Sequence, residues 1–331
     1  MRVLIVKTSS MGDLIHTLPA VTDAKKAIPG ISFDWVAEEG FSEIPSWHPA
    51  INKVIPIAMR RWRKNIVSAR GEIARFVNEL KYHEYDHVID AQGLIKSALV
   101  ARLAKGLHSG MDNKSCKESL ASLFYSKKYA ISKQAHAIER IRMLFADVLG
   151  YQYDSSSLDY GLLPSFFNDY NESVTPYLVF LHGTSGDYKL WPVEQWKLLT
   201  DIATTHGFTV YLPWGSEQER IRAELIANDF ASCHVLPKMN LTEIAGLIAH
   251  ASGVVGVDTG LAHLAAAIAI PGVTIYVDTY PRLTGSCGRN QICISKTKAQ
   301  QTITTMAGLE SVYSETLLAD EIWQWLAKKL R

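Results

Sequence analysis

The sequence predicts an α/β protein built from two doubly wound domains. Three observations support this prediction: a length of 331 residues, short runs rich in Val and Ile, and longer helical patterns between those runs. A chain of this length is long for one doubly wound domain and comfortable for two. Strands buried on both faces read as continuous apolar runs, and their alternation with helices implies parallel sheets joined by right-handed crossovers.

The predicted strands fall into two groups along the chain. The first group comprises Val3–Lys7, Phe33–Ala37, Val54–Ile57 and Val88–Asp90. The second group comprises Tyr177–Leu181, Thr209–Pro213, His234–Leu236, Val254–Asp258 and Thr274–Val277. The stretch between Asp154 and Pro176 is polar and lacks clear periodicity, as is typical of a domain boundary. We therefore expect one domain over residues 1–165 and a second over residues 175–313.

A helix is expected at the end of the chain, over residues 314–331. It would begin near Ser314 and carry an apolar face formed by Leu318, Ile322, Trp325 and Leu326. Basic residues at its C-terminal end complement the helix dipole. We expect this helix to pack on the body of the protein and to have no chemical role.

Composition indicates a soluble globular enzyme, with 47% hydrophobic and 20% charged residues. The four cysteines are Cys116, Cys233, Cys287 and Cys293. They form no Cys-x-x-Cys pair, so we expect free buried thiols rather than a zinc knuckle or a disulfide framework. Neither a signal peptide nor an apolar run of the ~18 residues that cross a bilayer is apparent. The protein is therefore expected to work in the cytoplasm, where it can still touch a membrane.

Basic residues are concentrated in the first half of the chain. The net charge is +1, but residues 1–165 carry 22 Lys and Arg against 17 Asp and Glu, while the remainder carries 12 against 16. Such an imbalance suits an anionic partner of the N-terminal half. It also arises by chance, and composition leaves both explanations open.

Two segments share one design, in which a buried strand is followed by a turn of small residues and a helix. They are Val3–Asp13 and Val254–Gly260. In an open α/β sheet such turns lie at the carboxyl edge, where ligands bind and where helix starts favour anions. Neither segment is a dinucleotide or P-loop fingerprint. Each alone is compatible with an ordinary strand–helix connection, but their presence in both predicted domains favours a binding function.

A third segment, His182–Pro192, follows a predicted strand and precedes a predicted helix. Within it Thr184, Ser185 and Lys189 are able to face a phosphate. The common alternative for Lys189 is a lysine in a solvated loop.

The run Arg60–Lys64 places four cations around one tryptophan. It suits a phosphorylated or carboxylated acceptor, or anionic headgroups. Composition alone favours a solvated helical or loop face. One short basic run in a near-neutral chain is weak support for a nucleic-acid partner, and we expect none.

The segment His83–His87 fits the zinc-protease pattern His-Glu-x-x-His. That chemistry needs both histidines on one face of a continuous helix. His87 directly precedes the predicted strand Val88–Asp90, so the helix should already have ended. We expect no zinc site.

Taken together, these segments resemble the lipopolysaccharide heptosyltransferase I family, within glycosyltransferase family 9. The resemblance is carried by Met1–Ala20, Phe33–Gly40, Ile57–Lys64, Ile89–Leu94, Leu212–Gly215 and Val257–Gly260. It spans most of the chain, to about residue 290. The opening and the basic run are specific to this family rather than to heptosyltransferase II.

The resemblance implies a GT-B fold, with two Rossmann-like domains facing a central cleft. It implies transfer of L-glycero-D-manno-heptose from ADP-heptose to the first Kdo of Kdo2-lipid A, during assembly of the lipopolysaccharide inner core. The family inverts the anomeric centre in a single displacement and uses no cofactor. The acceptor would bind the N-terminal domain, ADP-heptose the C-terminal domain, and the enzyme would sit on the cytoplasmic face of the inner membrane.

The resemblance also implies roles for individual residues. Asp13 matches the catalytic base and Lys189 matches the lysine at the donor phosphates. The other implied donor-binding residues are Thr184, Ser185, Glu217, Asp258, Thr259, Gly260 and His263. The implied acceptor-binding residues are Ser10, Gly12, Arg60, Arg61, Arg63 and Lys64. The loop that contains Glu217 and Glu219 is shorter than in the family, so the choice of the ribose-binding glutamate stays open. Glu217 is favoured and Glu219 is the alternative.

Two departures from the family affect the donor side. Ser185 stands where the family has a second threonine, and Tyr276–Thr279 stands where the family usually has Gly-Pro after the tyrosine. Donor contacts are therefore less well defined than the reaction class.

The implied chemistry is physically reasonable. A carboxylate at a helix start is held ionised, so Asp13 can take the proton of the attacking acceptor hydroxyl. Lys189 and the N–H groups at Thr259 and Gly260 can stabilise the departing diphosphate. No Asp-x-Asp motif occurs in the chain, so we expect no essential metal ion.

Two alternatives stay open on sequence. One is a sugar-nucleotide epimerase with the same fold, and the other is a non-catalytic two-domain binding protein. Asp13 separates enzyme from binder, since a binding protein would not need a base.

Overall fold

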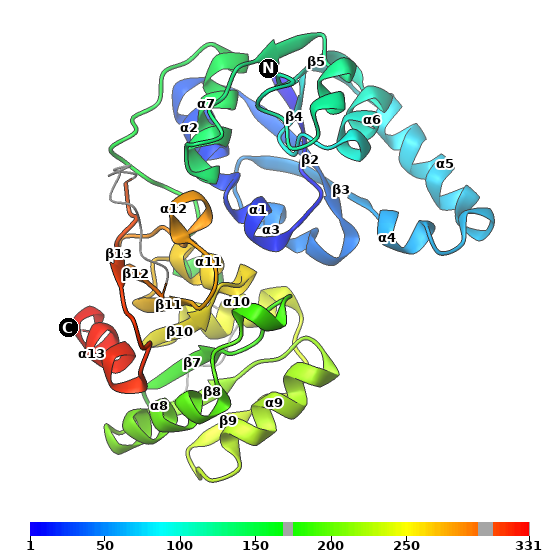
Figure 1. The fold of residues 1–331 in the computed structure, drawn as a ribbon. Coiled ribbons are helices and arrows are strands. Elements are labelled where there is room, and N and C mark those ends of the chain that lie inside the picture. Colours follow the sequence, from blue (N-terminus) through cyan, green and yellow to red (C-terminus); the bar gives the residue numbers. More distant parts are fainter. Residues whose placement is uncertain (168–174, 297–306, 331) are drawn as a thin grey trace. The chain divides into compact units, whose positions relative to one another are not determined.

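The computed structural model describes residues 1–167, 175–296 and 307–330. The chain forms two compact units (Figure 1). Unit 1 comprises Met1–Ser155 and Asp159–Gly161, and unit 2 comprises Ser156–Leu158 and Leu162–Arg331. Each unit contains one sheet whose neighbouring strands are all parallel, which confirms the predicted α/β class.

The sheet of unit 1 has the strand order β3-β2-β1-β4-β5-β6. Its strands are β1 (Arg2–Val6), β2 (Ser32–Glu38), β3 (Ile51–Ile57), β4 (Glu84–Asp90), β5 (Lys105–Met111) and β6 (Lys127–Tyr129). The strand order reverses between β1 and β4. In open parallel sheets the crevice at the carboxyl ends of two such strands is the usual ligand site.

Helices flank the sheet of unit 1. They are α1 (Met11–Ile15), α2 (Leu18–Ala27), α3 (Glu43–Ser46), α4 (Met59–Trp62), α5 (Ile66–Tyr82), α6 (Ile95–Leu103) and α7 (Ala137–Leu149), with short 3-10 helices η1 (Glu39–Phe41) and η2 (Ser119–Phe124). Phe76 and Leu80 of α5 are buried in one core cluster with Leu4, Val6 and Val88 of the sheet. This apolar packing seats α5 on the sheet.

The sheet of unit 2 has the order β13-β12-β11-β10-β7-β8-β9. Its strands are β7 (Tyr177–Leu181), β8 (Thr209–Leu212), β9 (Cys233–Val235), β10 (Gly253–Val257), β11 (Gly272–Tyr276), β12 (Gln291–Ser295) and β13 (Ser311–Tyr313). The order reverses between β7 and β10, so the loops that follow these two strands flank the switch point of unit 2.

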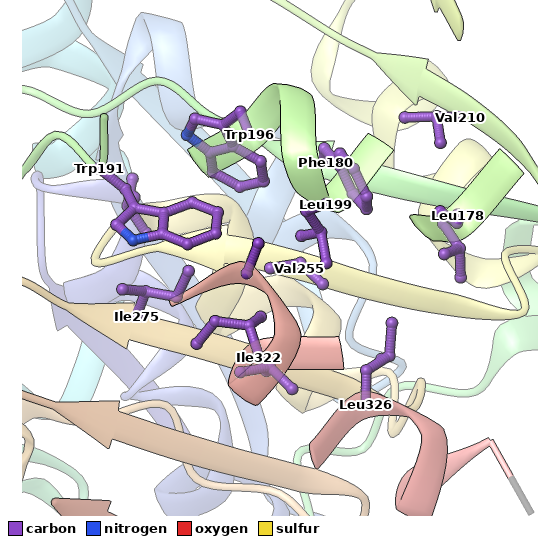
Figure 2. Close-up of a cluster of buried hydrophobic side chains, with 14 of the residues drawn as sticks. Leu178, Phe180, Trp191, Trp196, Leu199, Val210, Val255, Ile275, Ile322 and Leu326 are labelled. Carbon is purple, nitrogen blue, oxygen red and sulfur yellow. The ribbon is translucent and has the colours of Figure 1, made fainter. Parts of the chain in front are cut away.

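The helices of unit 2 are α8 (Val193–Thr205), α9 (Glu217–Ala227), α10 (Leu241–Ala249), α11 (Gly260–Ala267), α12 (Pro281–Thr284) and α13 (Ala319–Lys329), with η3 (Pro164–Phe167) and η4 (Asp187–Lys189). Figure 2 shows part of the core of this unit. The rings of Trp191 and Trp196 meet edge to face with centroids 5.0 Å apart. Ile322 and Leu326 of α13 belong to the same buried cluster, together with Ile275 of β11.

Several elements differ from the sequence prediction. The sequence analysis did not predict β5, β6, β12 or β13. The β5 segment contains two glycines and a lysine, which weakens its apolar pattern, and β6 and β13 have only three residues each. The final helix begins at Ala319 rather than near Ser314. Leu317 adopts a left-handed φ of 52°, which interrupts helical geometry before Ala319.

The expectation that a helix ends before His87 is confirmed. Helix α5 ends at Tyr82 and β4 begins at Glu84, so His83 and His87 do not lie on a common helix. All four cysteines lie within the described residues, are buried and form no disulfide. Within the three described stretches, no helix is long and apolar enough to cross a membrane.

Candidate active site

Asp13 lies in the first turn of α1, just beyond the carboxyl end of β1. Its Oδ2 accepts hydrogen bonds from the Ser10 backbone N–H at 3.0 Å and from the Ser10 hydroxyl at 2.9 Å. Its Oδ1 lies 3.2 Å from the Lys7 ammonium, and 41% of the side chain is exposed. The carboxylate is therefore held in one orientation while a substrate can still reach it.

The surroundings of Asp13 favour its charged form. Burial disfavours that form, but the Lys7 ammonium, the Ser10 N–H and His16 outweigh burial, so the pKa of the Asp13 carboxyl lies well below its usual range. The carboxylate stays ionised throughout the neutral pH range. Gly12, the other predicted residue of this turn, is buried within α1.

The four cations of the basic run occupy different environments. Arg61 lies 3.0 Å from a carboxylate oxygen of Glu39 and 2.9 Å from one of Glu72. The Arg60 guanidinium lies over the Phe41 ring, 5.5 Å from its centroid. All four basic residues from Arg60 to Lys64 are exposed. Arg61 is thus already neutralised by two carboxylates, which the sequence prediction did not anticipate.

A pocket of about 420 Å³ lies beside this run, inside unit 1. It is lined by residues of β3, α4 and α5, including Trp62 and Phe76. The Trp62 indole N–H donates to Glu72 at 2.9 Å. Glu72 therefore ties Trp62 and Arg61 of α4 to α5.

In unit 2, three predicted donor residues meet at the switch point. The Thr184 hydroxyl donates to the Asp258 carbonyl oxygen at 2.8 Å. The Lys189 ammonium lies 2.7 Å from Asp258 Oδ2, and its side chain is only 19% exposed. Lys189 is therefore not a solvated loop lysine. The loops after β7 and β10 are locked together through Asp258.

Thr279 also contacts this cluster, although the sequence analysis named it only as the end of the altered segment Tyr276–Thr279. Its hydroxyl donates to Asp258 Oδ2 at 2.9 Å, so one carboxylate oxygen accepts from both Thr279 and Lys189. Thr279 belongs to the segment after β11 that departs from the family pattern. The order of β10 and β11 brings it to the site, and that order is not visible in the sequence.

The remaining predicted donor residues are less closely connected to this cluster. Thr259 is the N-terminal cap of α11 and Gly260 is the first residue of that helix, so their N–H groups lie where helices leave backbone donors without intrahelical partners. His263 is buried in the same helix. Ser185 is exposed.

The two candidate ribose glutamates point to different surroundings. Glu217 pairs with Arg220 of its own helix, with contacts of 3.0 and 3.1 Å. Glu219 accepts from the backbone N–H groups of Gly215 at 2.6 Å and Ser216 at 3.2 Å. A Cβ placed on Gly183 would come within 2.6 Å of the Glu219 carboxyl group. Glu219 therefore borders the loop after β7, and the geometry favours it over Glu217.

Comparison with known proteins decides the family. Residues 73–310 match the profile of glycosyltransferase family 9 (heptosyltransferase). The chain is 50% identical over 318 residues to lipopolysaccharide heptosyltransferase 1 of Escherichia coli strain K12, covering 95% of this chain and all of that protein. The chain belongs to glycosyltransferase family 9. The chain is also 50% identical over 295 residues to lipopolysaccharide heptosyltransferase 1 of Pseudomonas aeruginosa, covering 88% of this chain and 83% of that protein.

Solved structures agree with the predicted fold. The structure of E. coli heptosyltransferase WaaC with ADP superposes with a TM-score of 0.89 at 46% identity, covering 99% of this chain and 100% of that one. WaaC with ADP-2-deoxy-2-fluoro heptose gives a TM-score of 0.85 over 99% of each chain. E. coli ADP-heptose lps heptosyltransferase II, at 21% identity, supports the fold alone, with a TM-score of 0.79 over 100% of this chain and 98% of that one. The predicted GT-B fold is confirmed, and the chain is a heptosyltransferase of lipopolysaccharide core assembly.

Proposed function

We propose that this heptosyltransferase transfers L-glycero-D-manno-heptose from ADP-heptose to the first Kdo of Kdo2-lipid A. Unit 2 binds the donor and unit 1 binds the acceptor. The observation that supports this most is the cluster of Thr184, Lys189 and Asp258 at the switch point of unit 2. It offers a cation and a hydroxyl to the diphosphate in a chain whose relative WaaC was solved with ADP.

On the donor side, Lys189 neutralises the diphosphate and Asp258 positions that lysine. An oxygen of Asp258 also accepts from a heptose hydroxyl. The Thr259 and Gly260 N–H groups at the start of α11 bind phosphate oxygens. His263 and Ser185 complete the donor contacts, and Glu219 rather than Glu217 binds the ribose.

In the reaction the acceptor oxygen forms its bond to the anomeric carbon as its proton passes to Asp13. The bond from that carbon to the diphosphate breaks on the opposite face, so the configuration inverts. Asp13 suits this role because it is ionised, oriented and partly exposed. Lys189 stabilises the charge that develops on the departing diphosphate, and no metal ion is required.

The substrates are tested by incubating the enzyme with ADP-heptose and Kdo2-lipid A in the presence of EDTA. Mass spectrometry should show one heptose added to the acceptor and release of ADP. Turnover that is lost in EDTA and restored by magnesium would contradict the metal-free mechanism. An unchanged acceptor mass with a consumed donor would contradict the proposed acceptor.

Cations near the acceptor should govern its affinity. The acceptor carries carboxylates and phosphates, which arginine forks bind bidentately. Charge-assisted hydrogen bonds contribute about 1.5–3 kcal/mol, so Arg60→Ala or Arg63→Ala should each raise the acceptor KM roughly tenfold and leave the donor KM unchanged. Lys64→Ala should act in the same direction. Steady-state kinetics with each substrate varied in turn measures both constants.

Arg61→Ala serves as the contrasting variant. Arg61 holds Glu39 and Glu72, so its loss should also lower the melting temperature. A rise in donor KM with an unchanged acceptor KM in the Arg60 or Arg63 variant would mean that the substrates are assigned to the wrong units.

We further propose that unit 1 contacts the anionic membrane surface through the start of α5. Ile66 and Val67 are 64% and 69% exposed there, and exposed Arg63, Lys64 and Arg70 flank them. Apolar side chains that enter the headgroup region contribute ~1.5–3 kcal/mol each when buried, and each basic residue adds ~1 kcal/mol. The enzyme should therefore float with phosphatidylglycerol vesicles that lack Kdo2-lipid A, and less so at high salt.

The double variant Ile66→Ser, Val67→Ser should lose most of this vesicle binding. Leu225→Ser in α9 is a matched control, because Leu225 is 55% exposed but lies in unit 2. Equal flotation of the double variant and the wild type would rule out this contact.

A further inference from the structure

Lys7 is a buried lysine that directly follows β1. Only 6% of the residue is exposed. Its ammonium donates to the Ala91 carbonyl oxygen at 3.1 Å and lies 3.2 Å from Asp13 Oδ1. Buried ammonium groups are costly unless they are paired, and these two contacts meet that requirement. The lysine therefore links the loop after β4 to the Asp13 carboxylate.

The backbone around Lys7 is held on two sides. The Trp35 indole N–H donates to the Lys7 carbonyl oxygen at 3.0 Å. The N–H and hydroxyl of Thr8 both donate to the side-chain oxygen of Gln92 at 2.8 Å. Buried Asp90 in turn accepts from the backbone N–H of Gln92 at 2.8 Å. The ammonium thus projects from a rigid frame across the crevice between β1 and β4.

Both oxygens of the Asp13 carboxylate are contacted by protein groups. Lys7 contacts Oδ1, while both Ser10 donors contact Oδ2. Two histidines also lie on this side: His16, directly after α1, which acts on Asp13, and His136, directly before α7, whose ring lies 5.6 Å from that of His16. Ser10 is neutral, so Lys7 supplies the ammonium that contacts the carboxylate.

We propose that Lys7 is a positioning residue for the reaction, which orients the Asp13 carboxylate toward the acceptor hydroxyl and keeps it charged at mildly acidic pH. The proposal rests on the proposed role of Asp13 as base. Lys7 itself transfers no proton, since its ammonium is directed at Ala91 and Asp13. Charge and orientation are separable contributions, because an arginine supplies the first without reproducing the second.

The sign of the expected pH effect follows from the causes of the Asp13 pKa. Burial raises that pKa, and the cation at Lys7 is the largest cause that lowers it. Removing the cation leaves burial less opposed, so the pKa of Asp13 should rise. A carboxylic acid is protonated below its pKa and cannot act as a base. On the acid side of the pH profile, the variant should therefore lose activity at a higher pH than the wild type.

The test compares Lys7→Met, which keeps side-chain length, with Lys7→Arg, which keeps the charge. In Lys7→Met we expect kcat/KM for the acceptor to fall at least tenfold. Its acid limb should move upward into the mildly acidic range, because the pH profile of kcat/KM reports the pKa of the essential base. Lys7→Arg should return the limb to its wild-type position with only part of kcat restored. Lys25→Met is the control, because Lys25 of the same unit donates to the Ile31 carbonyl oxygen at 3.2 Å.

A purely structural lysine would lower kcat or stability without moving the acid limb, and that result would overturn the proposal. Carbon-13 NMR titration of the Asp13 carboxyl, assigned with Asp13→Asn, measures the same shift without turnover and also serves a weakly active variant. An unchanged titration in folded Lys7→Met would likewise overturn the proposal. Full activity of Asp13→Asn would instead refute the base role in the proposed function, and the titration tells the two failures apart.

Discussion

Replacing Asp13 with alanine is expected to abolish turnover while leaving ADP affinity nearly unchanged. The carboxylate lies in unit 1, whereas the proposed nucleotide contacts lie in unit 2 around Asp258. Positioned base catalysis contributes about 10²–10⁴-fold, so kcat should fall by at least two orders of magnitude. Single-turnover kinetics and calorimetric titration with ADP measure the two quantities separately.

Asp13→Asn is the matched control for this variant. It retains the size of the side chain and can still contact Ser10, but it cannot take a proton. It should be nearly as inactive as Asp13→Ala. More than a tenth of wild-type kcat in either variant would remove Asp13 from the role of base.

Replacing Lys189 with alanine should weaken donor binding and reduce kcat. A lysine aimed at the diphosphate helps the ground state and helps more as negative charge grows during departure. Removal of one such electrostatic contact typically costs about 10²–10³-fold in kcat. Lys189→Ala also leaves Asp258 without its cation at 2.7 Å, so a carboxylate would face the diphosphate unneutralised.

A double-mutant cycle separates these two contributions. Combining Lys189→Ala with Asp258→Asn should lose less than the sum of the single losses, because residues that share one contact are not additive. Lys197→Ala is the control, since Lys197 forms an ion pair at 2.6 Å with Asp229 elsewhere in unit 2. Donor kinetics that are unchanged in Lys189→Ala would mean that Lys189 has no role in donor binding.

Local sequence patterns predicted the central strands of both sheets well. β1, β7 and β10 are continuous apolar runs, and such runs indicate strands buried on both faces. β5 was missed because its first half is exposed and contains a lysine and a glycine, and because pairing with β4 stabilises it rather than its own propensity. Of the three-residue edge strands, β9 was predicted as His234–Leu236, whereas β6 and β13 carry too little pattern to be recognised.

The candidate site likewise combines residues that local sequence predicts with contacts that only the fold creates. Asp13, Lys189 and Asp258 were assigned roles through the family resemblance, and each lies at or after the end of a strand that the sequence predicts. The contact of Thr279 with Asp258 and the ion pairs of Arg61 were not predicted, since they depend on strand order and helix packing.

Glu219 was ranked second although its sequence held a usable signal. Ser216 and Glu219 form a capping box, in which the glutamate side chain turns back toward the N-terminal end of the helix. That pattern predicts that Glu219 faces the loop before α9. Lys7 carried no such signal, because only the fold brings its ammonium to Ala91 and Asp13.

The central claim is a single displacement at the anomeric carbon, with Asp13 as base and the first Kdo as acceptor. It is tested most directly by NMR of the purified product from ADP-heptose and Kdo2-lipid A. The account predicts one new heptose on the first Kdo, with anomeric configuration opposite to that of the donor. A product with retained configuration, or a donor converted to an epimer with no glycosidic bond formed, would contradict it.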